Sequence, residues 1–113
     1  MLRIDFIMVN RTLVVVLEGE LDHHTCVEIR QTVDREYQKR RAKNLVFDFA
    51  NINFMDSSGI GMLMGRYRSV VICGGEIGLF NVSPEAEKIL AMSGIHKLMK
   101  TYSSKQEAID ALA

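Results

Sequence analysis

The order of apolar and polar positions predicts alternating strands and helices from the N-terminus onward. Residues Leu2–Val9 alternate along the chain, which is typical of a strand near the edge of a sheet. Residues Leu13–Leu17 are uniformly apolar and rich in β-branched side chains, as expected for a strand buried on both faces. Because Asn10-Arg11 can form a tight turn between them, the two strands are predicted to pair as an antiparallel hairpin.

The next stretch predicts the first helix. Its inner face is given by apolar residues at helical spacing: Cys26, Ile29, Val33 and Tyr37. Thr25 and Glu28 have the spacing of a capping box at the helix start. The basic residues between Lys39 and Lys43 are interpreted as solvated charges at its C-terminal end, where the helix dipole favours cations.

The remaining pattern completes an α/β fold. In chain order, the further elements are a strand at Asn44–Phe49, a helix at Ile60–Cys73, a strand at Glu76–Phe80, a helix from Ser83-Pro84-Glu85 to Ser93-Gly94, a short strand at Leu98–Tyr102 and a helix after Ser104. The order β-β-α-β-α-β-α-(β)-α predicts a mixed four- to five-stranded sheet with about four helices and parallel crossovers. At 113 residues, the whole chain (1–113) is expected to form one domain.

The segment Phe54–Gly61 joins the third strand to the central helix and carries the candidate chemistry. Asp56, Ser57 and Ser58 stand where side-chain oxygens can cap the free N–H groups of a helix. A phosphate on Ser57 would also meet the positive end of the helix dipole there. The ordinary alternative is that Asp56 or Ser57 only caps the helix.

The central helix has two distinct strips. The predicted buried face is Ile60, Leu63, Met64, Tyr67 and Val71, and beside it lie Ser57, Gly61, Gly65 and Arg68. Glycine inside a helix costs about 1 kcal/mol relative to alanine. The two glycines therefore predict the close approach of another backbone, either from the sheet or from a partner. Met62 lies off the buried face and is expected to contact a partner.

The predicted topology also gathers loops at one edge. In parallel sheets, ligands and partners meet the loops at the carboxyl ends of the strands. The residues expected to share that edge are Asp22, His23, His24, Ser57 and Asn81.

Three ordered motifs carry a family resemblance. They are Gly19-Glu20-Leu21-Asp22-His23-His24-Thr25, Phe54-Met55-Asp56-Ser57-Ser58-Gly59-Ile60-Gly61 and Met92-Ser93-Gly94-Ile95. The second resembles the phosphorylation site of bacterial anti-sigma factor antagonists in the STAS family. All three together resemble the sporulation-type antagonists, over nearly the whole chain.

The resemblance implies a switch protein that is not an enzyme. The unphosphorylated form would bind an anti-sigma factor with serine kinase activity and release a sporulation sigma factor. The kinase, with its own ATP and Mg²⁺, would phosphorylate Ser57, and a PP2C-type serine phosphatase would reverse the step. No cofactor is expected on this chain itself. The expected partner-binding residues are Asp22, His23, His24, Asp56, Ser58, Gly59, Gly61, Met62, Gly65, Arg66, Arg68 and Asn81. Within that set, Gly59 and Gly61 would let the partner approach, while Arg66 and Arg68 also fit solvated helix charges.

Three other classes of site are less consistent with the sequence. A serine hydrolase is disfavoured because Met55-Asp56-Ser57-Ser58-Gly59 lacks the first glycine of a nucleophile elbow and the chain has no obvious base and acid set. A STAS-type nucleotide or small-ligand binding or scaffold module without a phospho-switch is the main alternative, although no phosphate-binding glycine loop is present. A metal at His23, His24 and Cys26 has no supporting spacing.

The amino-acid composition limits the expected cellular location of the protein and the classes of partner that it can bind. Fourteen basic residues balance fourteen acidic ones, so the net charge of zero gives no general attraction to nucleic acid or to anionic membranes. No apolar run reaches the roughly 18 residues of a membrane span, and charges interrupt the N-terminal apolar run, unlike a signal peptide. Cys26 and Cys73 are expected to be free thiols of a cytoplasmic protein.

Overall fold

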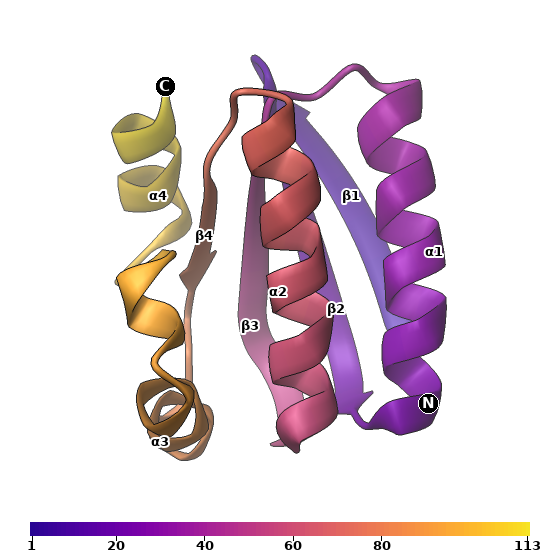
Figure 1. Ribbon diagram of the computed structural model, residues 1–113, viewed down its shortest axis with the longest axis vertical. Coiled ribbons are helices and arrows are strands. Elements are labelled where there is room, and N and C mark those ends of the chain that lie inside the picture. The colour runs from indigo at the N-terminus through magenta and orange to yellow at the C-terminus, as the bar shows by residue number, and fades with distance from the viewer.

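Five strands form one mixed sheet in the computed structural model, which describes residues 1–113 (Figure 1). Their order across the sheet is also their order in the chain: β1 (Arg3–Val9), β2 (Thr12–Leu21), β3 (Asn44–Met55), β4 (Ile77–Phe80) and β5 (Lys100–Tyr102). The β1–β2 pair is antiparallel and all other pairs are parallel. The predicted hairpin and α/β class are confirmed, and the short strand predicted at Leu98–Tyr102 is present as β5.

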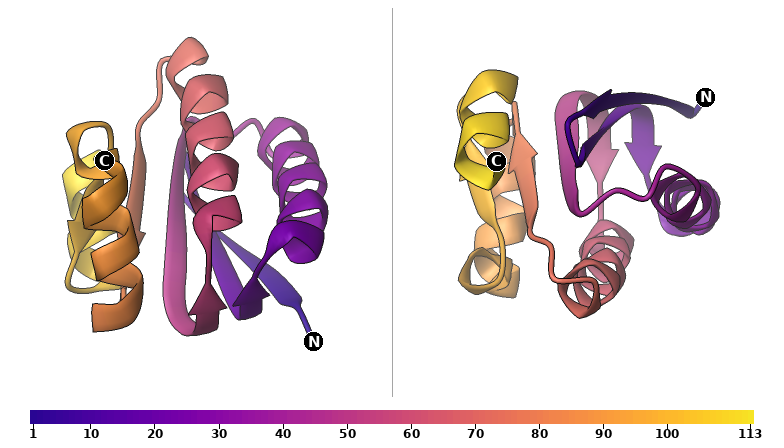
Figure 2. Two further views of the ribbon diagram at one scale, coloured as in Figure 1. Left: turned by 60° about the horizontal axis from the view of Figure 1, so that its bottom comes forward. Right: turned by 90° about the horizontal axis from the view of Figure 1, so that it is seen from above.

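The helices cover the two faces of the sheet unequally. They are α1 (His23–Lys39), α2 (Ser57–Ile72), α3 (Pro84–Ser93) and α4 (Lys105–Leu112), with a short 3-10 helix, η1 (Ile95–Lys97), after α3. The first three pack on the face that carries Leu13, Val15 and Leu17, and form the larger core. Helix α4 packs on the opposite face, against Val14 and Val46 (Figure 2).

Strands β2 and β3 extend further than the sequence predicts. They remain paired as far as Leu21 and Met55, although two register shifts interrupt the ladder. Strand β4 ends much earlier, at Phe80, which pairs with Asp48. The predicted strand stops at Phe49, although residues 50–54, which are largely exposed, continue to alternate between apolar and polar side chains. As a result, β2 and β3 together carry the starts of α1 and α2 beyond the rest of the sheet.

Helix α1 begins three residues before the predicted start, because its N-cap is Asp22 and not Thr25. Its N-cap is Asp22, whose Oδ1 accepts a hydrogen bond from the Thr25 amide at 2.9 Å, while the Asp22 amide donates to Thr25 Oγ1 at 3.0 Å. The predicted capping box of Thr25 with Glu28 is therefore wrong. Both pairs have the required spacing, but Thr25 Oγ1 also donates to the carbonyl of Glu20 at 2.6 Å, which holds Thr25 inside the first turn.

The buried face of α2 is rotated relative to the predicted one. Its buried residues are Gly59, Met62, Leu63, Arg66 and Val70, whereas Ile60, Met64 and Tyr67 are half-buried and Val71 is exposed. The reason is that α2 packs against α1 as well as against the sheet. Met62 and Arg66 consequently point inward, and the prediction that Met62 lies off the buried face of the helix is wrong.

Candidate functional site

Ser57 is the first residue of α2 and its side chain is exposed. The capping role belongs to Asp56, whose Oδ1 accepts a hydrogen bond from the Ser58 amide at 2.8 Å. The Asp56 amide in turn donates to the carbonyl of Leu21 at 3.2 Å, which ties the helix start to β2. The expectation that Asp56 caps the helix is confirmed, and this leaves the Ser57 hydroxyl free of that task.

The start of α1 lies beside the start of α2. Leu21 and Met55 pair as the last residues of β2 and β3, so Asp22 and Asp56 follow at the same level. His23 and His24 are exposed in the first turn of α1. The backbone hydrogen bond from Thr25 is the main cause that lowers the pKa of Asp22. The expectation that Asp22, both histidines and Ser57 share one edge is therefore confirmed.

Asn81 does not share that edge. It follows β4 at the level of Asp48, and its Nδ2 donates to Asp48 Oδ1 at 3.2 Å. Measured along β2, Asp48 and Met55 are separated by about five residue rises, or about 16 Å. The expectation failed because β2 and β3 continue past the end of β4.

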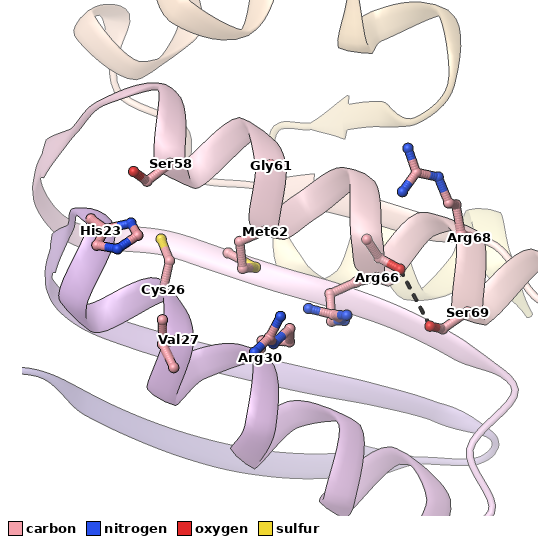
Figure 3. A pocket seen from close by; sticks show the side chains of 11 residues that line it. His23, Cys26, Val27, Arg30, Ser58, Gly61, Met62, Arg66, Arg68 and Ser69 are labelled. Atoms are coloured by element: carbon pink, nitrogen blue, oxygen red, sulfur yellow. Dashed lines mark hydrogen bonds between the residues drawn. The ribbon is translucent and has the colours of Figure 1, made fainter.

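A groove of about 580 Å³ runs between α1 and α2 (Figure 3). Its lining residues are His23, Cys26, Val27 and Arg30 of α1, and Ser58, Gly61, Met62, Gly65, Arg66, Arg68 and Ser69 of α2. Seven of the residues expected to bind a partner line this groove. One is His23 of α1, and the other six belong to α2. Arg68 is exposed, Ser58 is half-buried, and Met62 is buried in the floor of the groove.

The groove also contains residues that the sequence reasoning missed. The sequence analysis gives Val27 and Arg30 no role, and it places Cys26 on the inner face of the helix, with a metal site there disfavoured. Their signal was present, because residues 23, 26, 27 and 30 follow the spacing of one helix face. It was overlooked because the predicted α1 began after His23.

The three glycines of α2 have different surroundings. A Cβ atom on Gly59 would lie 2.7 Å from Cγ of Met55, so Gly59 is required by internal packing rather than by a partner. A Cβ atom on Gly61 or Gly65 would meet nothing within 4 Å. The predicted close approach of another backbone at these two glycines is thus not made by the sheet.

Arg66 is neither a solvated charge nor a simple surface contact. It is only 6% exposed, and its Nε lies 2.7 Å from Oδ1 of Asp34 on α1. Desolvation lowers the pKa of Arg66 and nearby Arg30 lowers it further, whereas Asp34 raises it. The expectation of a solvated helix charge is wrong for Arg66, because α2 turns this side chain toward α1.

Neither cysteine forms a disulfide. Burial is the main cause that raises the pKa of Cys26 to about 11, and Cys73 is exposed. No group of three or more metal-ligating side chains is arranged to hold an ion. None of the helices has the length and apolar character needed to cross a membrane.

Comparisons with known proteins agree with this architecture. Residues 3–108 match the family model of the STAS domain. An anti-sigma F factor antagonist of Paenibacillus polymyxa is 40% identical over 100 residues, which are 88% of this chain and 86% of that protein. The structure of the anti-sigma factor antagonist SpoIIAA in its unphosphorylated form has a TM-score of 0.83 at 34% identity, and covers 96% of this chain and 95% of its own.

A second solved structure describes the Bacillus cell fate determinant SpoIIAA in the phosphorylated form. It matches with a TM-score of 0.75 at 34% identity, over 98% of this chain and 100% of its own. The family resemblance read from the three motifs is confirmed. The matched family model, the related sequence and the shared fold show that this chain belongs to the STAS domain family.

Proposed function

We propose that this chain is an anti-sigma factor antagonist that is switched by phosphorylation of Ser57. The unphosphorylated form binds an anti-sigma factor with serine kinase activity and thereby releases a sporulation sigma factor. The observation that carries the proposal is the exposed Ser57 hydroxyl at the start of α2, beside Asp22, His23 and His24. The antagonist of Paenibacillus polymyxa and the two forms of SpoIIAA support the same role.

The cap at Asp56 determines how a phosphate on Ser57 acts. The amide of Ser58 is already bound by Asp56 Oδ1, and the amide of Gly59 lies 3.0 Å from the Asp56 carbonyl. Fewer free N–H groups remain than at an uncapped helix start, so the phosphate extends into the docking surface. It brings about −1.5 to −2 charges at neutral pH. A partner surface that fits a neutral hydroxyl then meets added bulk and a charge that it must desolvate.

The chemistry belongs to the partners. With the kinase's ATP and Mg²⁺, Oγ of Ser57 attacks the γ-phosphorus, and the bond from that phosphorus to the β–γ bridging oxygen breaks. ADP leaves, and the hydroxyl proton passes to a base of the kinase or to solvent. A PP2C-type serine phosphatase restores the hydroxyl by hydrolysis and releases inorganic phosphate. In this scheme the chain itself holds no cofactor and catalyses no step.

The second candidate function is a nucleotide or small-ligand binding module without a phospho-switch. The observation that favours it is the groove between α1 and α2, which Arg30 and Arg68 line. Calorimetry with ATP and with GTP on the isolated chain separates the two functions, because the switch requires no nucleotide binding by this chain.

Phosphorylation is tested by intact mass and peptide mapping after incubation with the anti-sigma factor kinase and Mg-ATP. We expect one added phosphoryl group on Ser57, its loss in Ser57→Ala, and its retention in the matched control Ser58→Ala. We also expect Ser57→Ala to remain a constitutive binder of the kinase. An unmodified chain in the presence of an active kinase would overturn the phospho-switch.

A further inference from the structure

Arg66 has a buried hydrogen-bond donor without an acceptor. Its Nε approaches Asp34 Oδ1 at 2.7 Å, but this ion pair lacks hydrogen-bond geometry, and Nη1 is buried with no partner at all. A buried donor that loses water without gaining an acceptor destabilises the fold. Because Arg66 lines the groove between α1 and α2, an acceptor from outside the chain can reach that side chain there.

The groove around Arg66 is cationic. Arg30, Arg66 and Arg68 line it together with His23, and none of its lining residues is acidic, although the chain as a whole has a net charge of zero. Figure 3 shows Arg30 of α1 beside Arg66 of α2. The influence of Arg30 on the pKa of Arg66 agrees with that closeness. Two neighbouring guanidinium groups with one carboxylate between the helices favour the binding of a second anion.

The shape of the groove fits a length of polypeptide. It follows α2 from Ser58 to Ser69, which is about 16 Å at 1.5 Å per residue. That length corresponds to about five residues of extended chain. Gly61 and Gly65 face open space along it, so a backbone can lie directly against the helix. The binding of an isolated ion would require neither a groove of this length nor a side lined by glycines.

We propose that the groove between α1 and α2 receives an extended segment of a protein partner, with one aspartate or glutamate of that segment bound by Arg66 and Arg30. Because Nη1 is buried in the free chain, binding includes a small turn of the Arg66 side chain toward the groove. The planar guanidinium then donates from Nη1 to the carboxylate, a geometry in which arginine binds carboxylates well. The inference rests on the proposed function in taking the anti-sigma factor as this partner.

The first test uses the whole chain and a small probe. The arginine Nε–H signals are followed by NMR during titration with an end-blocked Gly-Ser-Glu-Ser-Gly peptide, its glutamine counterpart and inorganic phosphate. We expect saturable shifts of Arg66 and Arg30 with the glutamate peptide, at least about fivefold larger than with the glutamine peptide. An equal response to both peptides, or no saturable shift, overturns the proposal. Tighter saturation by phosphate overturns the carboxylate as the occupant.

The second test measures affinity for the anti-sigma factor kinase. Arg30→Gln and Arg66→Met are expected to weaken binding about tenfold. The matched control Arg35→Gln, an exposed arginine of α1 outside the groove, should stay within about twofold. Arg66→Met keeps the apolar stem, and Arg30→Gln changes an exposed side chain, so at least one variant folds normally.

The outcomes of these tests distinguish the docking groove from the phosphorylation switch at Ser57. Wild-type affinity in both Arg30→Gln and Arg66→Met, with Ser57 still phosphorylated, overturns the groove as a docking site and leaves the phospho-switch standing. Conversely, a saturable glutamate-peptide response in a chain that the kinase does not modify supports the groove and overturns the proposed function.

Discussion

The starts of α1 and α2 are built alike but are held differently. Each follows a strand end in the pair Leu21–Met55, and each has an aspartate as its N-cap. At α1 the Asp22 cap is reciprocal, because the carboxylate accepts from the Thr25 amide and the Asp22 amide donates back to Thr25 Oγ1. At α2 the Asp56 carboxylate makes a single bond, to the Ser58 amide.

Because of this difference, we call the start of α1 the fixed start and the start of α2 the modifiable start. At the start of α1, Asp22 and Thr25 hydrogen-bond to each other, so a change to either residue disturbs the fold. The first residue of α2 is a serine whose hydroxyl lies outside the cap and is exposed. A phosphate can therefore be added at α2 while the helix start and its tie to β2 are retained.

The largest expected effect comes from placing a charge at the modifiable start. We expect Ser57→Glu to lower affinity for the anti-sigma factor kinase at least about tenfold, through repulsion and desolvation at the docking surface. The melting temperature should stay unchanged or rise slightly, because an acidic residue in the first turn favours the helix dipole. Calorimetry and thermal unfolding give the two quantities.

The matched control for that variant is Ser57→Gln, which has similar bulk without charge. Equal losses of affinity in both variants would assign the effect to size alone. A marked loss of stability in Ser57→Glu would show that Ser57 supports the fold, which contradicts the contrast between the two helix starts.

The next largest effect is the loss of thermal stability when either helix cap, Asp22 or Asp56, is removed. We expect Asp22→Ala to lower the melting temperature by about 6 °C and Asp56→Ala by about 3 °C, because the first change also breaks the reciprocal bond to Thr25. Thermal unfolding at pH 7 measures both. A larger loss in Asp56→Ala would reverse the assignment of fixed and modifiable starts.

A smaller effect concerns the glycines that follow Ser57. Gly61→Ala should raise the free energy of unfolding by about 0.5–1 kcal/mol, because helix propensity improves and the new Cβ meets nothing. Gly59→Ala should instead lower it by about 1 kcal/mol, since its Cβ would press against Met55. Urea unfolding measures both. A destabilised Gly61→Ala would mean that Gly61 serves the fold rather than a partner.

Local patterns were sufficient to predict most of the fold. The alternation of strand and helix, the cap at Asp56 and the helix end at Gly94, which has a positive φ of 78°, each depend on residues close in sequence. The first cap was predicted wrongly because Thr25 can pair with either Asp22 or Glu28 at the same spacing. The choice depends on a bond to Glu20, outside the helix.

The site was less predictable because it depends on contacts between elements. Periodicity shows that α2 has a buried stripe, but the packing of α2 against α1 decides that Met62 and Arg66 turn inward. The burial of Arg66 also requires Asp34 on another helix. Asn81 was misplaced because β3 continues past the end of β4, through an exposed stretch that alternates like a strand but whose two asparagines are also typical of turns.

The smallest expected effect is the acid dependence of the fixed start. The pKa of Asp22 is lowered, chiefly by the hydrogen bond from the Thr25 amide, so the ionised carboxylate is the form that stabilises the fold. Its contribution is fully present above the pKa of the unfolded chain, which is near 3.8, and is lost as pH falls through the lower folded pKa.

Urea unfolding between about pH 5 and about pH 2 should therefore show a steeper loss of stability for the wild type than for Asp22→Asn. The difference should be modest because solvent screens this partly exposed group. Parallel curves for the two proteins would mean that the Asp22 cap works equally well without its charge, and that geometry alone holds the start of α1.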